Sequence, residues 1–496
     1  MKKMTLKSRL FGGVVAVSAA LLAVSCAQGF DDNETWKSDV TGTQLESPAL
    51  TEANFATKVN PDGSESVQVS WDVVKGAGGY ECVAAIVDDP ENPVEVFNGV
   101  VDSPTFSFTK LEDTKYEVSV KTLGNEKLDN TEAAAPTSIA YSTLVPAQLI
   151  PAGQDIVAFV EANILDQDKE QAFELEGGAS YEINAPLDFG NRLVTFRGDK
   201  LNRAKVKFGL DGVIRTSAGL KIKFIDFDCD EMASKGVIEG SDEPDASLDA
   251  ANFAGYAGAG KVFILKDPIV MQECNFRQVK RCLFFTGRCS WGVEDIRVMD
   301  CVVQLDNNGQ SFGDAAVFCT YSGTSIGPAG GATWTSAIRN ITVKNSTLYN
   351  IRDNSKNRMV RFATNQMGRI FDSQYGSATF ENCTISKIMN GKEFANNTPN
   401  RAEYTVTFNN NICYDVFRLQ KFIQGNCTKN VNMATNTIWG VAQSVDSTDK
   451  SKYATEEDPQ FAGPIEEPWD LSQEKGGVNF KAAGAISSTI GDPRWK

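Results

Sequence analysis

The chain of 496 residues contains no histidine. Histidine is the usual general base near neutral pH and a common metal ligand, so its absence excludes histidine-based catalytic triads and histidine-ligated metals. The sequence also has no Cys-x-x-Cys pair, which disfavours a zinc knuckle. Acidic residues outnumber basic ones, and the formal net charge is −16. A protein of this charge repels a phosphate backbone, and we expect no nucleic acid among its partners.

Long apolar runs are missing except near the N-terminus. There, basic residues precede an apolar run over residues 10–24. A run of about 15 residues is short for crossing a bilayer, and the order of basic and apolar residues is typical of a secretory signal. We therefore expect residues 1–25 to be a signal peptide that is removed.

The residues around Cys26, Leu22-Ala23-Val24-Ser25-Cys26, resemble a bacterial lipobox. The resemblance implies cleavage before Cys26 and lipidation of that residue; the alternative is a plain signal peptide with a chance cysteine. The acidic stretch at 28–34 resembles the export signal of surface lipoproteins in glycan-degrading Bacteroidota. It implies a lipid anchor in the outer membrane with the protein facing the cell exterior, the alternative being an acidic flexible tether. Residues 26–47 are polar and are predicted to be a tether.

A short phrase recurs in the second half of the chain. Each copy has a turn-forming residue, a small or polar residue, a spacer and an apolar residue. The copies begin at Glu273, Asp300, Asn345, Asn382, Asn410 and Thr435. Spacings in the twenties with occasional insertions are typical of a solenoid, because one repeat cannot bury its apolar face alone.

Alternation of apolar and polar residues surrounds each phrase, as in Ile341 and Val343 before Asn345. This pattern predicts a strand, a sharp turn and a second strand in each coil, with the Asn side chains stacked. The pattern resembles a right-handed parallel β-helix of the pectate-lyase-like kind over residues 143–441. Asp155 is predicted to cap a short helix that covers the open end of the solenoid.

Cysteine is more frequent than usual, with eleven residues. Cys274, Cys301 and Cys383 occupy the same position of the repeated phrase, on the face predicted to point inward. Small buried thiols fill a core well. We expect most of the cysteines to be free and buried.

Residues 48–142 alternate over several short segments separated by turn signals, which predicts a β-sandwich. Trp71 on an early strand and Tyr116 at the start of a later one resemble a fibronectin type III-like module. Both side chains are interpreted as core residues rather than ligand platforms. Residues 442–496 lose the repeat and resemble the closing segment of β-helix lipoproteins from glycan-using Bacteroidota. The expected fold is thus mainly β, with a sandwich followed by a parallel β-helix.

Three acids follow one another at alternate positions, Asp226, Asp228 and Asp230. If the residues between them point inward, the carboxylates project from one outer face about 7 Å apart. Such a row suits Ca²⁺, which binds several oxygen ligands. A solvated acidic turn is the alternative, and no other cofactor is predicted.

Basic residues lead several of the strands downstream of the phrases. The candidates for contact with an anionic glycan are Arg281, Arg358, Arg361 and Lys421, because Arg and Lys pair with carboxylates. Salt bridges to neighbouring acids are the alternative. Trp291 and Trp334 are candidates for stacking on sugar rings, although a packing role is equally compatible with the sequence.

These features favour a cell-surface lipoprotein that binds polysaccharide, pectin-like or otherwise acidic, for a glycan importer complex. A polysaccharide lyase or hydrolase on the same fold is the first alternative, although the Arg-containing motif of the best-known pectate lyases is not recognisable and no catalytic residue is assigned. A non-catalytic adhesin or structural surface protein is the second. Fold alone does not separate them.

Overall fold

The computed structural model describes residues 40–306, 316–320, 336–352, 357–362, 367–388, 394–416, 418–419, 421–440, 447–467, 469–470, 472–473 and 475–496. It divides into two compact units, residues 1–144 and 145–496. Within the described residues, no helix is both long and apolar enough to cross a bilayer. The predicted signal peptide, Cys26 and residues 27–39 of the predicted tether lie outside the described residues. Residues 40–47 do not form a tether, because Leu45 is buried and its backbone N–H donates to the Thr131 carbonyl of the sandwich unit at 3.0 Å.

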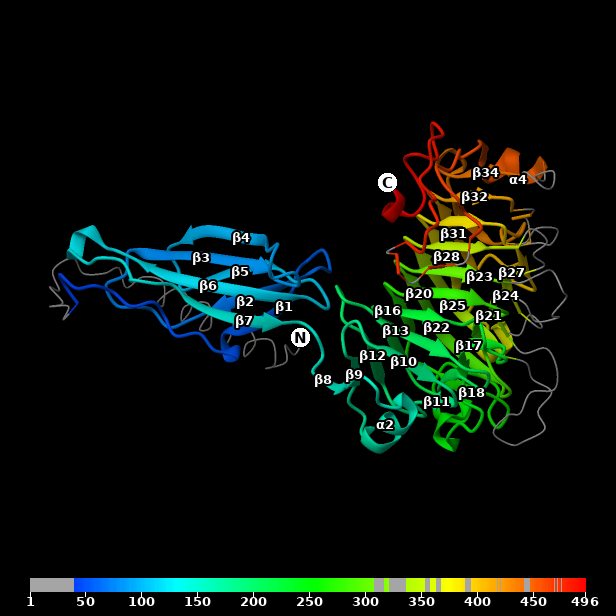
Figure 1. The fold of residues 1–496 in the computed structure, drawn as a ribbon, viewed down its shortest axis with the longest axis horizontal. Coiled ribbons are helices and arrows are strands. Elements are labelled where there is room, and N and C mark those ends of the chain that lie inside the picture. The colour runs from blue at the N-terminus through cyan, green and yellow to red at the C-terminus, as the bar shows by residue number, and fades with distance from the viewer. Residues whose placement is uncertain are drawn as a thin grey trace, which may run out of the picture. The chain divides into compact units, whose positions relative to one another are not determined.

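The first unit is a sandwich of two antiparallel sheets (Figure 1). One sheet has the order β1 (Phe55–Val59), β2 (Glu65–Ser70), β5 (Thr105–Thr109), and the other β4 (Val94–Val101), β3 (Gly79–Ile86), β6 (Lys115–Leu123), β7 (Thr137–Ser142). The short helices η1 (Glu52–Asn54) and η2 (Glu126–Leu128) belong to this unit. Trp71 and Tyr116 are buried in its core, as predicted. The backbone N–H of Leu111 donates to the hydroxyl of Tyr116 at 2.8 Å, which satisfies the polar end of this buried ring.

The second unit is a solenoid of three parallel sheets (Figure 1). The ten-stranded sheet has the order β10 (Ser180–Ile183), β13 (Ala204–Phe208), β16 (Ile225–Asp228), β20 (Asn275–Val279), β23 (Val302–Leu305), β26 (Thr347–Asn350), β29 (Thr384–Ser386), β32 (Ile412–Tyr414), β34 (Thr437–Trp439), β35 (Thr455–Glu456). The seven-stranded sheet has the order β11 (Pro186–Asp188), β14 (Val213–Thr216), β17 (Gly236–Gly240), β21 (Cys282–Phe285), β24 (Ala316–Cys319), β27 (Arg358–Arg361), β30 (Ala395–Asn396).

The eleven-stranded sheet has the order β33 (Thr428–Val431), β31 (Thr405–Asn409), β28 (Ser377–Glu381), β25 (Ala337–Lys344), β22 (Trp291–Met299), β19 (Ile269–Gln272), β15 (Leu220–Lys223), β12 (Val194–Arg197), β9 (Gln171–Leu175), β8 (Ala147–Ile150), with β18 (Phe263–Leu265) paired to β22. The remaining elements are α2 (Ile156–Asn163), α3 (Met367–Ile370), α4 (Ser447–Lys452), η3 (Ala246–Leu248), η4 (Ala250–Asn252), η5 (Met433–Thr435) and η6 (Pro493–Trp495). The predicted mainly β class, a sandwich followed by a right-handed parallel β-helix, is confirmed.

The repeated phrase forms the turn between the eleven-stranded and ten-stranded sheets. Its first residue has a positive φ of 49° to 58° in five coils: Glu273, Asp300, Asn345, Asn382 and Asn410. The Asn382 side chain donates to that of Asn345 at 3.1 Å, so these two side chains stack as predicted. Thr435 differs, because it lies in η5. Phe224 occupies the same position one coil before Glu273, with a φ of 58°.

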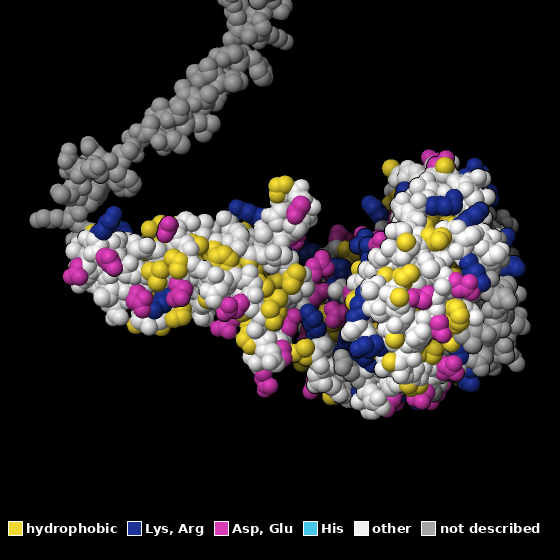
Figure 2. Space-filling view, turned by 90° about the horizontal axis from the view of Figure 1, so that it is seen from above, with side chains coloured by type: hydrophobic (Ala, Val, Ile, Leu, Met, Phe, Trp, Pro, Cys, Tyr) yellow, Lys and Arg dark blue, Asp and Glu magenta, His cyan; other side chains and the backbone are white. Residues whose placement is uncertain are grey.

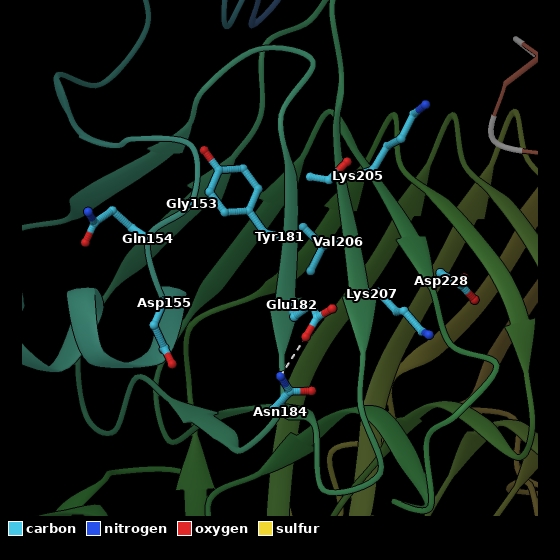
Figure 3. Close-up of a pocket in the computed structure, with 11 residues that line it drawn as sticks. Gly153, Gln154, Asp155, Tyr181, Glu182, Asn184, Lys205, Val206, Lys207 and Asp228 are labelled. Atoms are coloured by element: carbon cyan, nitrogen blue, oxygen red, sulfur yellow. Dashed lines mark hydrogen bonds between the residues drawn. The ribbon is translucent and has the colours of Figure 1, made fainter.

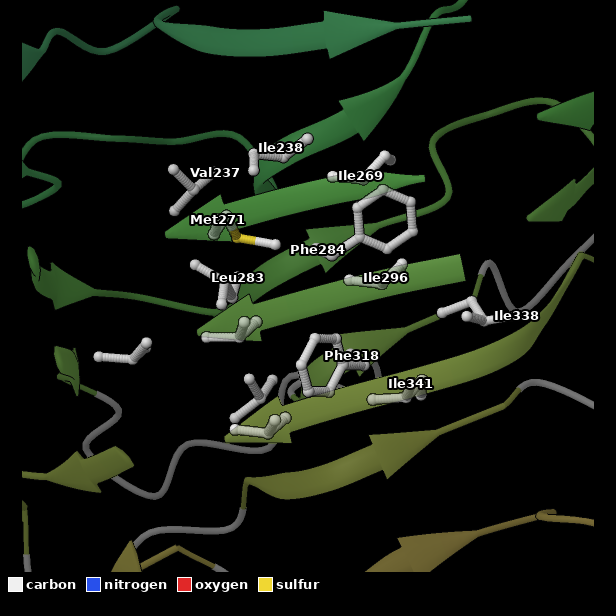
Figure 4. Packing of buried hydrophobic residues seen from close by; sticks show 14 of the residues in the cluster. Val237, Ile238, Ile269, Met271, Leu283, Phe284, Ile296, Phe318, Ile338 and Ile341 are labelled. Atoms are coloured by element: carbon white, nitrogen blue, oxygen red, sulfur yellow. The ribbon is translucent and has the colours of Figure 1, made fainter. Parts of the chain in front are cut away.

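The core consists of rows of side chains that repeat from coil to coil. Ile269, Ile296 and Ile341 are register partners on successive strands (Figure 4). Phe208, Phe227 and Phe276 stack with ring centroids 5.6 and 5.1 Å apart. The ten described cysteines, all those other than Cys26, are free and buried, as predicted. Such a dry, tightly packed column fixes the outward-facing side chains of the same strands.

The first coil is covered by α2. Asp155 caps this helix by accepting from Ala158 N at 3.0 Å. Ile156 and Val160 of α2 are buried in the solenoid core. The predicted helix and its cap are therefore confirmed.

Candidate functional site

The outer face of the ten-stranded sheet changes chemistry along the solenoid. Because side chains alternate across a strand, every second residue faces outward, and register partners line up in columns. The first column reads Ser180, Lys205, Asp226, Asn275, Val302, Thr347, Thr384, Ile412 and Thr437. The first four strands thus present ionic or strongly polar groups, and an apolar residue first appears at Val302.

The later, less polar half of this face is covered by the C-terminal segment, residues 457–496, drawn in orange to red in Figure 1. A separate small core forms between the two. Its buried members are Val302, Tyr349, Ile465, Trp469, Val478, Phe480 and Trp495. The segment therefore folds back along the sheet, over strands formed more than 100 residues earlier. Apolar burial of this kind contributes roughly 25 cal/mol per Å².

A buried polar cluster fixes the end of the segment. The carboxylate of Asp492, fully buried, is paired with Arg494 and accepts from the Thr347 hydroxyl at 2.6 Å. The indole N–H of Trp495 donates to the same hydroxyl at 2.7 Å. Arg494 also donates to the carbonyls of Asp300 and Cys301 at 2.9 and 2.6 Å.

Gly491 precedes this cluster and has a φ of 83°. A Cβ at this position would lie 2.7 Å from Ile412 Cδ1 and 2.8 Å from Thr384 Oγ1. Only glycine fits both the backbone conformation and this close approach to the sheet.

A groove of about 670 Å³ lies between the edge of the covering segment and the earlier strands of the ten-stranded sheet. Its lining contains five bases and one acid. The bases are Lys200, Arg203, Lys205, Lys475 and Arg494, and the acid is Asp226. Among the described lining residues, the groove is therefore cationic in a protein whose net charge is −16. Figure 2 shows basic and acidic side chains interspersed over the face that it presents.

A second compartment of about 600 Å³ adjoins the first, and Lys205 lines both. Its acids are Asp155, Glu182 and Asp228, and its other base is Lys207. Figure 3 shows Lys205 extending away from Lys207, and Glu182 hydrogen-bonded to Asn184 at 2.9 Å. The two compartments therefore differ in charge: the first is cationic and the second is weakly acidic.

Most charges on this face already have partners. Asp228 pairs with Arg277 at 2.6 Å, and Lys207 pairs with Glu231 at 2.6 Å. Arg203 lies 3.6 Å from Asp226 and 4.0 Å from Glu273. Lys205 differs: within the described part of the chain, its ammonium has no carboxylate within 4.0 Å. A half-exposed ammonium of this kind is available to an anionic ligand.

Asp226 is the acid of the cationic compartment. Burial raises its pKa above the ordinary value, while Arg203, Asn275 and Lys205 act in the opposite direction. Its side chain accepts from the Asn275 amide at 2.7 Å. These contacts hold the acid against the sheet and reduce its repulsion of an anionic ligand.

The predicted calcium row does face outward, since Ile225 and Phe227 are buried between the acids. Each carboxylate, however, has a basic partner: Asp226 with Arg203, Asp228 with Arg277, and Asp230 with Lys280 at 2.8 Å. Among the described residues, no group of three or more acids and cysteines is arranged to hold a metal ion. The three acids act as ion-pair partners, which corrects the calcium prediction.

The predicted basic stripe lies on a different face, along the seven-stranded sheet. Arg358 and Arg361 are on β27, and Arg281 directly precedes β21. These three arginines are half-buried and have partners. Lys421 is exposed, and its carbonyl accepts from the Thr398 hydroxyl at 2.8 Å. The structure thus places these residues on one side, away from the cationic groove.

Trp291 was a candidate for sugar stacking, and this prediction is wrong. Its side chain is fully buried at the start of β22 and packs against Phe263, with ring centroids 5.6 Å apart. An apolar ring at an inward position of a strand serves the core. Trp334 lies outside the described residues.

The groove bases were not identified from the sequence. Lys205 and Lys207 alternate with Ala204, Val206 and Phe208, so alternation could have placed both on the outer face. Lys475 and Arg494 could not have been assigned in the same way. Their position depends on the folding back of the C-terminal segment.

Comparisons with known proteins give two family models and a fold likeness. Residues 1–187 match a domain of unknown function, DUF4992, and residues 179–351 match another, DUF4957. No curated protein matches the sequence. Two solved structures of pectate lyase PelI from Erwinia chrysanthemi are similar. The one in complex with tetragalacturonic acid has 9% identity and a TM-score of 0.18, and covers 76% of this chain and 99% of its own.

The second PelI structure has 11% identity and a TM-score of 0.16, and covers 69% of this chain and 88% of its own. At such scores the likeness says nothing about the ligand of this chain. The DUF4957 match extends over β10 to β26 and so includes the strands that form the floor of both compartments.

Proposed function

We propose that this protein is a lipid-anchored surface lipoprotein that binds an acidic polysaccharide in the groove of the ten-stranded sheet. The observation that supports it most is the set of five bases gathered there, of which Lys205 has no carboxylate within 4.0 Å of its ammonium among the described residues. Carboxylate and sulfate groups are recognised by bases arranged in this way, and arginine adds bidentate geometry. In this proposal the protein delivers the bound glycan to an importer complex.

The sandwich unit fits the role of a spacer. Its three-plus-four strand arrangement and the hydrogen bond from Leu111 N to the Tyr116 hydroxyl suit the fibronectin type III-like module that the sequence resembles. The lipobox-like residues before Cys26 and the acidic stretch at 28–34 support anchoring in the outer membrane, with export to the cell surface.

Binding is tested with soluble protein comprising residues 40–496 and a panel of acidic and neutral polysaccharides, by retarded migration in glycan-containing gels and by calorimetry. Lys205→Glu is expected to weaken binding at least tenfold, equivalent to about 1.4 kcal/mol. Lys266→Glu is the matched control, because Lys266 is exposed and lies outside both compartments. Equal loss in both variants, or no binding of any acidic glycan, contradicts the proposal.

The same samples also test the lyase alternative. Absorbance of an unsaturated product is followed with homogalacturonan, with and without Ca²⁺. Retardation without product supports a binding protein. Steady product release that Lys205→Glu abolishes would instead identify a polysaccharide lyase.

A further inference from the structure

The two compartments that meet at Lys205 differ in charge, and this difference bears on the ligand. The cationic compartment lies over β13, β16, β20 and β23, against the C-terminal segment. The acidic compartment lies over β10, β13 and β16, against the loop before α2. From β10 to β23 the two compartments together cross four strand spacings, roughly 19 Å. A ligand that fills both compartments is therefore an oligosaccharide segment rather than a single sugar.

An anionic sugar would be accommodated poorly in the acidic compartment. Its base Lys207 is paired with Glu231 and its acid Asp228 with Arg277, so Asp155 and Glu182 remain as its acids without a salt bridge among the described residues. Its carboxylates include Glu182, which is exposed and bonded only to the neutral Asn184 amide among the described contacts. A second carboxylate beside Glu182 would be repelled. The amides of Gln154 and Asn184 and the hydroxyl of Ser180, which also line this compartment, suit the hydroxyls of a neutral sugar.

We propose that the ligand is a sparsely charged polysaccharide, with an anionic sugar in the cationic compartment and a neutral sugar beside Glu182, and not a polymer charged at every residue. This inference rests on the proposed function, because it assigns the charge pattern of the glycan bound there. Lys205, at the junction, contacts the anionic group. Glu182 is the residue that selects against a second charge.

The effect of the ligand's charge density is tested with two oligogalacturonides of equal length. One has every carboxylate free, and the other has half of its carboxylates methyl-esterified. Calorimetry with residues 40–496 should give at least fivefold tighter binding of the half-esterified form. Glu182→Lys should reverse that order, by making the second compartment cationic. Asp211→Lys is the control, because Asp211 is exposed and lines neither compartment. It should leave the order unchanged, and circular dichroism checks the fold of each variant.

Tighter binding of the fully charged form to the unmodified protein would overturn this inference while leaving the proposed function intact. An unchanged order in Glu182→Lys would also overturn it, because the second compartment would then take no part. Failure of both forms to bind, together with no effect of Lys205→Glu on any glycan of the wider panel, would instead overturn the proposed function.

Discussion

At the scale of single residues, the second position of the repeated phrase has a role beyond filling the core. In several coils its side chain accepts a hydrogen bond from the backbone N–H of the equivalent residue one coil earlier. Cys301 N donates to Ser346 Oγ at 3.1 Å, and Cys383 N donates to Asn411 Oδ1 at 2.9 Å. Asn411 N in turn donates to Asn436 Oδ1 at 3.0 Å. Small polar residues thus satisfy buried donors that the turns leave unpaired.

Replacing Asn411 tests this ladder. Asn411 is fully buried, and its amide also donates to the Phe380 carbonyl at 2.9 Å. Asn411→Ala would leave the buried Cys383 N–H without its acceptor and remove one donor to the Phe380 carbonyl, and should lower the free energy of unfolding by about 2–4 kcal/mol. Asn430→Ala, an exposed control, should change it by less than about 0.5 kcal/mol. Denaturant unfolding followed by fluorescence measures both, and equal values would refute the ladder.

The contribution of Asp306 to the stability of the fold should depend on pH. Burial acts to raise its pKa, but the hydrogen bonds from Arg352 at 2.5 Å and Lys280 at 2.8 Å outweigh burial, and the net pKa is lowered. A depressed carboxyl pKa stabilises the fold above the unfolded pKa and loses that contribution as the pH falls through the folded value.

Asp306→Asn should therefore cost about 1–2 kcal/mol at pH 7, the range being modest because both partners are partly exposed. The difference from the unmodified protein should shrink as the pH is lowered below about 4. Urea unfolding at several pH values measures it, with Asp211→Asn as an exposed control. A difference independent of pH would show that the ion pairs are not its cause.

At the scale of elements, the sequence predicted the coils and the helix over the first coil, but not the folding back of the C-terminal segment over the ten-stranded sheet. The strands and turns around Asn345 and Asn382 were predictable because alternation and left-handed turns leave a local pattern. Phe224 was not, because a bulky residue at positive φ gives no such signal. The contact of Asp492 with Thr347, 145 residues apart, has no periodic trace in the sequence. The groove could not be predicted from the sequence for the same reason, because about half of its lining residues belong to the C-terminal segment that folds back.

The covering segment should be removable without unfolding the solenoid. The double variant Asp492→Ala/Trp495→Ala removes the two side chains that bind Thr347. It should release residues 457–496, expose Val302 and Tyr349, and so increase binding of a hydrophobic dye. Limited proteolysis should then cleave within the released segment first.

Lys481→Ala is the control within the same segment, because Lys481 is exposed. It should leave both dye binding and cleavage unchanged. Circular dichroism should show that the β content of the double variant is largely retained. Cooperative loss of the whole solenoid would show instead that the segment is integral to the fold. Persistent protection of residues 457–496 would show that the Asp492 cluster does not hold them.

At the scale of the whole molecule, the local charge of the groove is opposite in sign to the net charge of the protein. The protein has a net charge of −16, yet five bases meet at one groove. The net negative charge of the protein repels an acidic polymer, whereas the bases of the groove attract it. Binding in the groove is therefore favoured over non-specific adsorption to the rest of the surface. The histidine-free composition also means that this charge pattern changes little between pH 6 and 8.

The proposed location of the molecule rests on lipidation of Cys26. Since residues 40–47 pack on the sandwich unit, the predicted tether is shortened to residues 26–39, and 14 residues would reach at most roughly 50 Å if fully extended. This reach is enough to hold a binding unit clear of the lipid headgroups. In bacterial cells the full-length chain should incorporate an alkyne fatty acid and partition with membranes. Cys26→Ser should abolish both, whereas Ser25→Ala, which keeps a small residue before the cysteine, should preserve them.

Because the groove is more than 170 residues away from Cys26 in sequence, purified Cys26→Ser should still bind glycan. Loss of binding would mean that lipidation does more than anchor the protein. Labelling of Cys26→Ser equal to that of the unmodified chain would refute the lipobox interpretation.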